Sequence, residues 1–180
     1  MLKIRISNTD RIGIMPSAET IDATDARLLL ALIEQPRATA LWLADRLQIS
    51  RNTIQSRLSR IEQSAVLESL ERRISLKPLG YPLTAFVTTQ VTQRELDHVA
   101  AALARIPEVL QVHGISGQAD LLVHVAAVNA DDLYRIAGQI LAIPGVERTQ
   151  TSLVMRELVP YRVTPLLERL AARRTEQRRT

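Results

Sequence analysis

Two short amphipathic segments follow one another within residues 39–67. The first predicts a helix over 40–47, and the second predicts a helix that begins after Ser50, whose hydroxyl suits an N-cap. On the second segment three apolar residues recur at i, i+4 and i+7: Ile54, Leu58 and Ile61. This spacing places them on one stripe of a helix, which would face a core. Two helices joined by so short a connection form a helix-turn-helix corner.

The side of the second helix away from its apolar stripe is polar and basic. No acidic residue lies between Ser50 and Ile61. Arginines and hydrogen-bonding side chains of this kind contact phosphates and base edges in double-stranded DNA. The residues that we expect to contact DNA are Ser50, Arg51, Asn52, Gln55, Ser56, Ser59 and Arg60. The spacing alone also fits an ordinary helix whose polar face is only solvated.

A further helix and a small sheet complete this predicted unit. Asp22 lies three residues before Asp25, as in a helix N-cap, and the helix would stop before Pro36. After the second helix, four apolar residues flank a charged centre: Val66, Leu67, Ile74 and Leu76. Their pattern predicts the two short strands of a wing. We therefore expect a winged helix-turn-helix domain over 21–77 and a hinge over 78–82, where proline and glycine interrupt the pattern.

The chain beyond this hinge repeats a motif. Leu-Ala-Arg-Ile-Pro-Glu-Val at 103–109 returns as Ile-Leu-Ala-Ile-Pro-Gly-Val at 140–146, and in both copies a helix would end at proline before a strand begins. The elements predicted in order are strand 83–91, helix 93–106, strand 109–115, strand 120–127, helix 130–143 and strand 146–157. This is the βαββαβ order of a ferredoxin-like domain, expected over 83–160. The whole chain is thus predicted as α+β.

The sheet of such a domain has one face without helices, and that face should be polar in a monomer. Here both alternating sets of positions in the predicted strand 120–127 are largely apolar. In the predicted strand 83–91, Phe86 lies on the opposite face from its apolar neighbours. A sheet that is apolar on both faces needs a partner, and a second copy of the chain is the simplest one. We therefore expect a homodimer through this domain.

Composition narrows the class of protein. Apolar residues make up 46% of the 180 residues, and their runs are too short to span a bilayer. The chain has no cysteine, which excludes disulfides and thiolate metal sites. Its first residues lack the apolar core of a signal peptide. We expect a cytoplasmic protein that does not associate with membranes.

The two ends of the chain extend beyond the predicted domains. Residues 1–20 form an N-terminal extension whose first residues alternate with period two, as an edge strand or a frayed tail would. Residues 161–180 form a basic C-terminal tail with a short helix from Thr164, and 162–180 hold six arginines and two glutamates. Such a charge run is more typical of a solvated tail than of a DNA clamp.

No arrangement of catalytic residues is found in the sequence. Gly114-Ile-Ser-Gly lacks the spacing of a nucleophile elbow, and no glycine-rich phosphate loop is present. His98, His113 and His124 lack the spacing of metal ligands. We therefore expect no catalytic residue, no metal and no cofactor, and a protein that is not an enzyme.

These motifs resemble those of the Lrp/AsnC family, the feast/famine transcription regulators of bacteria and archaea. In the first domain the likeness rests on Asp22, Asp25, Leu28 and Leu29, and on Leu43-Ala44, Ile49-Ser50, Thr53-Ile54, Arg57-Leu58 and Ile61-Glu62. In the second domain it rests on Ser-Gly-Gln-Ala-Asp-Leu at 116–121 and on Pro-Gly-Val and Thr-Gln-Thr within 144–151. Gln48 departs from the family, which usually has glycine at that turn.

The resemblance implies a sequence-specific DNA-binding transcriptional regulator. Its second domain would bind an amino-acid effector and control the assembly of dimers into larger rings, often octamers. The effector contacts that the resemblance implies are Gly117, Gln118, Asp120, Thr149 and Thr151. A glycine lets the backbone approach a ligand, although a tight turn closed by Asp120 explains the same residues without one. The alternative function is a stand-alone amino-acid-sensing or scaffold protein without specific DNA binding.

Overall fold

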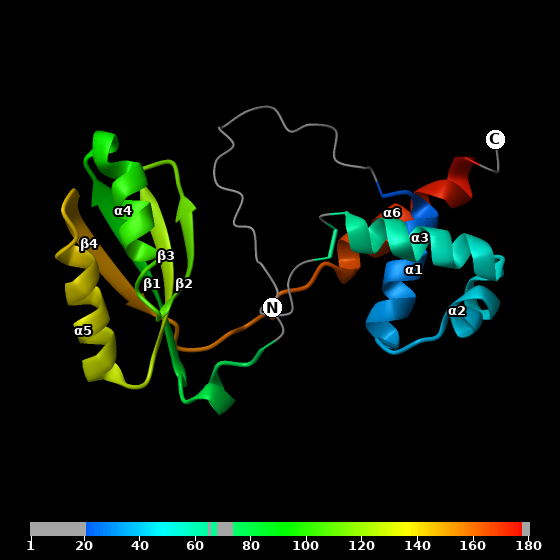
Figure 1. Ribbon diagram of the computed structural model, residues 1–180, viewed down its shortest axis with the longest axis horizontal. Helices are drawn as coiled ribbons and strands as arrows, with labels where there is room; N and C mark the ends of the chain where they lie inside the picture. The colour runs from blue at the N-terminus through cyan, green and yellow to red at the C-terminus, as the bar shows by residue number, and fades with distance from the viewer. Residues whose placement is uncertain (1–20, 65, 68–73, 178–180) are drawn as a thin grey trace, which may run out of the picture. The chain divides into compact units, whose positions relative to one another are not determined.

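The computed structural model describes residues 21–64, 66–67 and 74–177, and the chain divides into two units (Figure 1). The first unit combines the residues up to 68 with those from 161 onward, and the second comprises residues 69–160. The chain therefore leaves the first unit, forms the second and returns to the first.

The described part of the first unit consists of helices: α1 (Ala23–Glu34), α2 (Ala40–Leu47), α3 (Arg51–Gln63) and α6 (Thr164–Gln177). The first three begin after Asp22, Thr39 and Ser50, whose side chains accept hydrogen bonds from backbone N–H groups of the first turn. The helix over 40–47 and the helix that starts after Ser50 are thus confirmed. Together they form the predicted helix-turn-helix.

The apolar faces of these helices meet in one core. Leu28 of α1, Leu43 of α2 and Ile54 of α3 are fully buried in it, and each contributes about 2 kcal/mol of hydrophobic stabilisation. Ile61 is also buried and Leu58 packs against the same cluster. The apolar stripe predicted on α3 therefore faces the core, and the opposite side of α3 is left exposed.

The C-terminal segment is not the separate tail that we expected from its charge. Helix α6 packs against α1, and Leu167 joins the core of the first unit. Residues 164, 167, 170 and 171 are half-buried, whereas Leu166 is 67% exposed. This i, i+3, i+6, i+7 spacing makes one apolar stripe, a pattern that the arginines of the same segment obscure in the sequence.

Two predicted features fall largely outside the described residues. The wing would occupy 66–76, and of its apolar residues the structure describes Leu67 and Ile74 as exposed and Leu76 as half-buried. The strand-like extension over 1–20 lies wholly outside. Neither the wing nor the extension is therefore tested.

The second unit is a four-stranded antiparallel sheet in the order β2-β3-β1-β4. Its strands are β1 (Leu83–Val91), β2 (Val109–Gly114), β3 (Leu121–Ala127) and β4 (Val146–Leu153), and its helices are α4 (Leu96–Leu103) and α5 (Ala130–Leu141). Two short 3₁₀ turns, η2 (Lys77–Leu79) and η3 (Gln93–Glu95), precede β1 and α4. The ferredoxin-like βαββαβ fold is confirmed.

Both helices pack on the same face of this sheet. Val99 and Leu103 of α4 and Ile136 of α5 share one fully buried cluster with Val87 of β1 and Val123 of β3. The large buried aliphatic side chains make this cluster a continuous core, separate from that of the first unit.

Several predicted ends differ from the structure. The end of β2 at Gly114 and the start of β3 at Leu121 each lie one residue inside the expected bound. The helix expected over 93–106 begins as the turn η3 and its α-helical part ends at Leu103, because the N–H groups of Arg105 and Ile106 bond three residues back, as in a 3₁₀ turn. The helix expected to 143 ends at Leu141. The strand expected to 157 ends at Leu153, where its pairing with β1 stops at Ala85.

The sheet face without helices is partly apolar, as expected. Phe86 and His124, which pair across β1 and β3, stack with ring centroids 4.7 Å apart. Phe86 is 37% exposed, and Leu122 beside it is half-buried. Partial burial, and to a lesser extent the charge of His113, lower the pKa of His124.

The glycine of Pro-Gly-Val at 144–146 has a local steric cause. Gly145 has φ +95°, and a Cβ there would lie 2.6 Å from the Cβ of Glu95. Only glycine fits both the backbone conformation and the space. The turn that starts β4 is thus packed directly onto the segment that starts α4.

Candidate nucleic-acid interface and effector site

Helix α3 presents an exposed polar face that begins at its N-cap. Ser50 Oγ accepts a hydrogen bond of 3.2 Å from the Thr53 N–H and lies 2.8 Å from Thr53 Oγ1. All seven residues expected to contact DNA are exposed: Ser50, Arg51, Asn52, Gln55, Ser56, Ser59 and Arg60. Because the hydroxyl of Ser50 caps the helix, this residue has a structural role as well. Whether these residues touch DNA remains a prediction.

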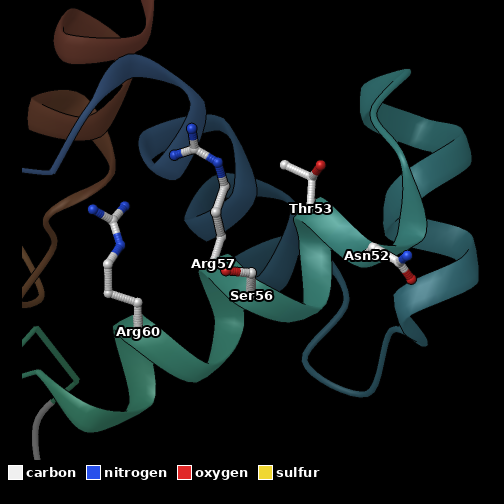
Figure 2. Close-up of a pocket in the computed structure, with 5 residues that line it drawn as sticks. All are labelled: Asn52, Thr53, Ser56, Arg57 and Arg60. Atoms are coloured by element: carbon white, nitrogen blue, oxygen red, sulfur yellow. The ribbon is translucent and has the colours of Figure 1, made fainter.

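Part of this face is hollowed into a shallow depression. Its lining comes from one side of α3 and consists of Asn52, Thr53, Ser56, Arg57 and Arg60 (Figure 2). The side chains of Arg57 and Arg60 extend to the same side of α3, toward α1 (Figure 2). Thr53 and Arg57 were not among the residues expected from the sequence.

Two carboxylates at the start of α1 hold these arginines. Arg57 Nη1 donates to Asp25 Oδ1 at 2.6 Å and to Asp22 Oδ2 at 2.8 Å. Arg60 Nη2 donates to Asp25 Oδ2. The side chain of Asp25 is 1% exposed, and those of Arg57 and Arg60 are 24% and 43% exposed. A buried carboxylate is therefore paired with two partly exposed guanidinium groups.

The same carboxylates also cap α1. Asp22 Oδ1 accepts from the N–H groups of Thr24 and Asp25, and Asp25 Oδ2 accepts from the N–H of Asp22 at 3.1 Å. This reciprocal capping box fixes both side chains. The ion pairs therefore connect α3 to a rigid helix start.

These contacts shift the pKa values of both partners. Burial alone would raise the pKa of Asp22, but hydrogen bonds from the Asp25 N–H and the Arg57 guanidinium outweigh it and lower the pKa. Burial would lower the pKa of Arg57, but its bonds to Asp25 and Asp22 outweigh that effect and raise it. Both groups are thus held in their charged forms.

No acid lies between Ser50 and Ile61 in the sequence, and the spacing of Asp22 and Asp25 predicts only a helix cap. In the structure these acids pair with two of the three arginines of 50–61, from 32 or 35 residues earlier in the chain. The only sequence signal was the spacing Asp-x-x-Asp at a helix start. That spacing does not reveal which helix the carboxylates face.

The turn between α2 and α3 shows how Gln48 replaces the usual glycine. Gln48 has φ 55° and ψ 49°, the left-handed conformation, and its Nε2 donates to the Asp45 carbonyl at 2.8 Å. The side-chain hydrogen bond offsets part of the strain of about 1 kcal/mol that a non-glycine residue has there. The corner is therefore kept without glycine.

Three of the five implied effector residues lie in the turn between β2 and β3. Gly117 has φ +122°, a conformation that favours glycine. Asp120 Oδ2 accepts from the Val91 N–H at 2.8 Å, and the Gln118 carbonyl accepts from Gln90 Nε2 at 2.6 Å. The turn is thus fastened to the end of β1, and the carboxylate of Asp120 has a structural role there.

The other two implied effector residues lie on β4, with β1 between them and the turn. Thr149 pairs with Thr89 of β1, and Thr151 pairs with Val87. Thr89 also pairs with Leu121, the residue after Asp120. Its hydroxyl is fully buried and has no hydrogen-bond partner among the described residues. No sequence pattern marks Thr89 as unusual, because it looks like any threonine in an apolar strand.

The residues that the structure describes contain no cluster of three or more metal-ligating side chains. None of their helices is both long and apolar enough to cross a bilayer.

Comparisons with known proteins agree with this architecture. The model of the Lrp/AsnC ligand binding domain matches residues 84–164. The HTH-type transcriptional regulator PH1916 of Pyrococcus horikoshii is 35% identical over 140 residues, which span 74% of this chain and 91% of the relative. Escherichia coli AsnC superposes with a TM-score of 0.74 at 23% identity, over 81% of this chain and 99% of AsnC.

A further similar solved structure is a complex with an amino acid. The feast or famine regulatory protein of M. tuberculosis complexed with L-methionine superposes with a TM-score of 0.69 at 27% identity, over 79% of this chain and 97% of that protein. These relationships define the class of protein that the fold and the exposed α3 face had indicated. The chain belongs to the Lrp/AsnC family of helix-turn-helix transcriptional regulators.

Proposed function

We propose that α3 is the recognition helix of a sequence-specific DNA-binding protein, with Ser50, Arg51, Asn52, Gln55, Ser56, Ser59 and Arg60 as its contacts. The observation that carries this proposal is the division of α3 into a buried apolar stripe and an exposed face without a single acidic residue between 50 and 61. Such a helix fits a major groove, with arginines and N-terminal N–H groups on phosphates. The protein then acts on transcription by occupying particular DNA sites.

A mobility-shift assay tests this proposal. The full chain is titrated against DNA from upstream of its own gene and against a shuffled duplex of the same length and composition. We expect the upstream fragment to bind more tightly and both affinities to fall linearly with the logarithm of salt concentration. Equal affinities would overturn sequence-specific binding and favour the stand-alone sensing or scaffold function.

We further propose that the second unit binds an amino acid at the turn of Gly117, Gln118 and Asp120 together with Thr149 and Thr151. The L-methionine complex of the M. tuberculosis relative supports this ligand class. The positive φ of Gly117 supports it too, because exposed N–H groups in such a turn suit a carboxylate. Thermal unfolding with each of the twenty amino acids tests it, since a ligand at a hundred times its Kd adds about 2.7 kcal/mol. Twenty unchanged midpoints would contradict an amino-acid effector.

The sheet face around Phe86 and His124 supports a homodimer, because a stacked aromatic pair with half-buried Leu122 is left without helices over it. We propose that such dimers assemble into larger rings, such as an octamer, and that the amino acid changes this assembly. Light scattering with and without amino acids measures the size of the assembly and its change on ligand binding. A monomer at micromolar concentration would contradict the dimer.

The remaining expectations belong to the same proposal. We infer a cytoplasmic regulator that works without a catalytic residue, metal or cofactor and does not associate with membranes. Its family consists of transcriptional regulators rather than enzymes.

A further inference from the structure

We propose that Asp25 is a positioning residue for DNA recognition, which neutralises Arg57 and Arg60 and fixes their guanidinium groups beside the recognition face. These two arginines then help to choose among DNA sequences and contribute little to general attraction for DNA. The proposal rests on the proposed function of α3, and it concerns a residue of α1 that does not itself contact DNA.

The side chain of Asp25 is held rigidly at the start of α1. Its carboxylate is 1% exposed and receives hydrogen bonds from Arg57, from Arg60 and from the N–H of Asp22. The capping box holds this side chain in place, so the two guanidinium groups are tied to a fixed point on α1. An arginine already held in position loses less conformational entropy when it binds.

Arg60 has N–H donors beyond the one that bonds to Asp25. The bond to Asp25 uses Nη2 of Arg60, whose side chain is 43% exposed, and Nε and Nη1 have no partner among the described residues. A guanidinium carries five N–H donors in a planar fork, so a carboxylate can hold one part while another part contacts a guanine. Arg60 also lines the depression together with Asn52 and Ser56, which places it among hydrogen-bonding groups.

The charges of the two arginines are balanced by nearby carboxylates. Two carboxylates, Asp22 and Asp25, face the two arginines, so the cluster has no net charge. A neutral cluster gives little release of counterions from DNA, which is the main source of non-specific affinity. Arg51 differs, because the described residues provide no carboxylate partner for it. Non-specific affinity for DNA would then come from Arg51 and the N-terminus of α3. Selectivity among DNA sequences would come from Arg57 and Arg60, which the two carboxylates hold.

Asp25→Asn in the full chain tests the proposal. Asparagine keeps an oxygen for the N–H of Asp22 but turns an NH₂ group toward one arginine and removes the charge. With the shuffled duplex, we expect tighter binding and a salt slope that is steeper by about 0.9 for each arginine released. We also expect the preference for the upstream fragment to fall about tenfold. Glu62→Gln is the matched control, because it removes one exposed acid from α3 and should change neither the slope nor the preference.

If Asp25→Asn does not fold, the variants Arg60→Gln and Arg51→Gln test the proposal instead. We expect Arg60→Gln to reduce the preference about tenfold with little change in slope. Arg51→Gln should lower the slope by about 0.9 and leave the preference unchanged. Equal weakening on both duplexes with an unchanged slope in Asp25→Asn would overturn the proposal. A slope loss in Arg60→Gln as large as in Arg51→Gln would also overturn it.

The two proposals fail in different ways. A wild-type chain that binds both duplexes equally overturns sequence-specific binding by α3. The salt slopes on the shuffled duplex need no preferred sequence, so they still decide whether Asp25 neutralises the arginines.

Discussion

Arg57 Nη1 donates a hydrogen bond of 2.6 Å to Asp25 Oδ1, which joins helix α3 to the start of α1. The two residues are 32 positions apart, and the carboxylate is buried while the guanidinium is 24% exposed. The orientation of α3 in the first unit therefore depends on an ion pair as well as on the apolar core.

Arg57→Ala should destabilise the first unit by about 2 kcal/mol. Removing one partner of a buried carboxylate leaves that charge less well compensated, although Arg60 remains bonded to Asp25. Urea unfolding followed by circular dichroism measures the change. The control is Arg46→Ala, because the pair of Arg46 with Glu34 is 3.8 Å long and more than half exposed on both sides. It should cost less than about 0.5 kcal/mol, and equal losses in the two variants would contradict the buried-pair account.

Leu167→Ala should destabilise the first unit by about 1 to 2 kcal/mol, because Leu167 of α6 packs into the core shared by α1, α2 and α3. Its neighbour Leu166 is 67% exposed, so Leu166→Ala should change stability by less than about 0.5 kcal/mol. Thermal unfolding of both variants checks the expectation. Two equally small effects would mean that α6 does not form part of this unit in solution.

Gly145→Ala should destabilise the second unit by about 3 kcal/mol. The added methyl group would lie 2.6 Å from the Cβ of Glu95, and alanine is also strained at φ +95°. The same substitution at Gly138, a helical position in α5 with nothing within 4 Å, should instead stabilise by roughly 0.5 to 1 kcal/mol. The two variants should shift the unfolding midpoint of the wild type in opposite directions. A stable Gly145→Ala variant would contradict the packing of this turn against η3.

Stability should fall as the pH is lowered from 8 to 5.5, and His124 should cause part of the fall. Partial burial lowers the pKa of His124 in the folded state, with a smaller effect from His113, so the unfolded chain takes up a proton first. The stabilisation is present above the unfolded pKa of about 6.5 and is lost as the pH falls through the folded pKa.

His124→Phe checks this expectation because it keeps a ring to stack on Phe86 and removes the titration. The free energy of unfolding of the variant should depend less on pH over this range than that of the wild type. The range lies above the pKa of ordinary carboxyl groups, so Asp22 stays ionised throughout. An unchanged pH profile would show that His124 is not the group concerned.

Local sequence patterns predicted most of the secondary structure. The first and last residues of β1 and the first residues of β2, α5 and β4 were expected where the structure has them. The repeated proline and valine positions mark the starts of β2 and β4, and Asn129 caps α5. The end of β4 could not be predicted in the same way. Its extended pattern continues beyond Leu153, but pairing with β1 stops at Ala85, which the local pattern does not indicate.

The candidate site was less predictable, because its main interactions connect distant parts of the chain. The exposure of the α3 face followed from helical periodicity. The pairing of Asp25 with Arg57 and Arg60 depends on how α1 crosses α3, and the sequence spacing contains no information on that angle. Similarly, the packing of Leu167 depends on the return of the chain to the first unit, which a basic segment does not reveal.

The central claim is that α3 reads DNA sequence, and a competition measured by fluorescence anisotropy tests it most directly. The full chain is bound to a labelled fragment from upstream of its own gene and displaced with either the unlabelled fragment or the shuffled duplex, at physiological salt. We expect the upstream fragment to compete about a thousandfold better. Equal competition by the two duplexes would contradict the claim.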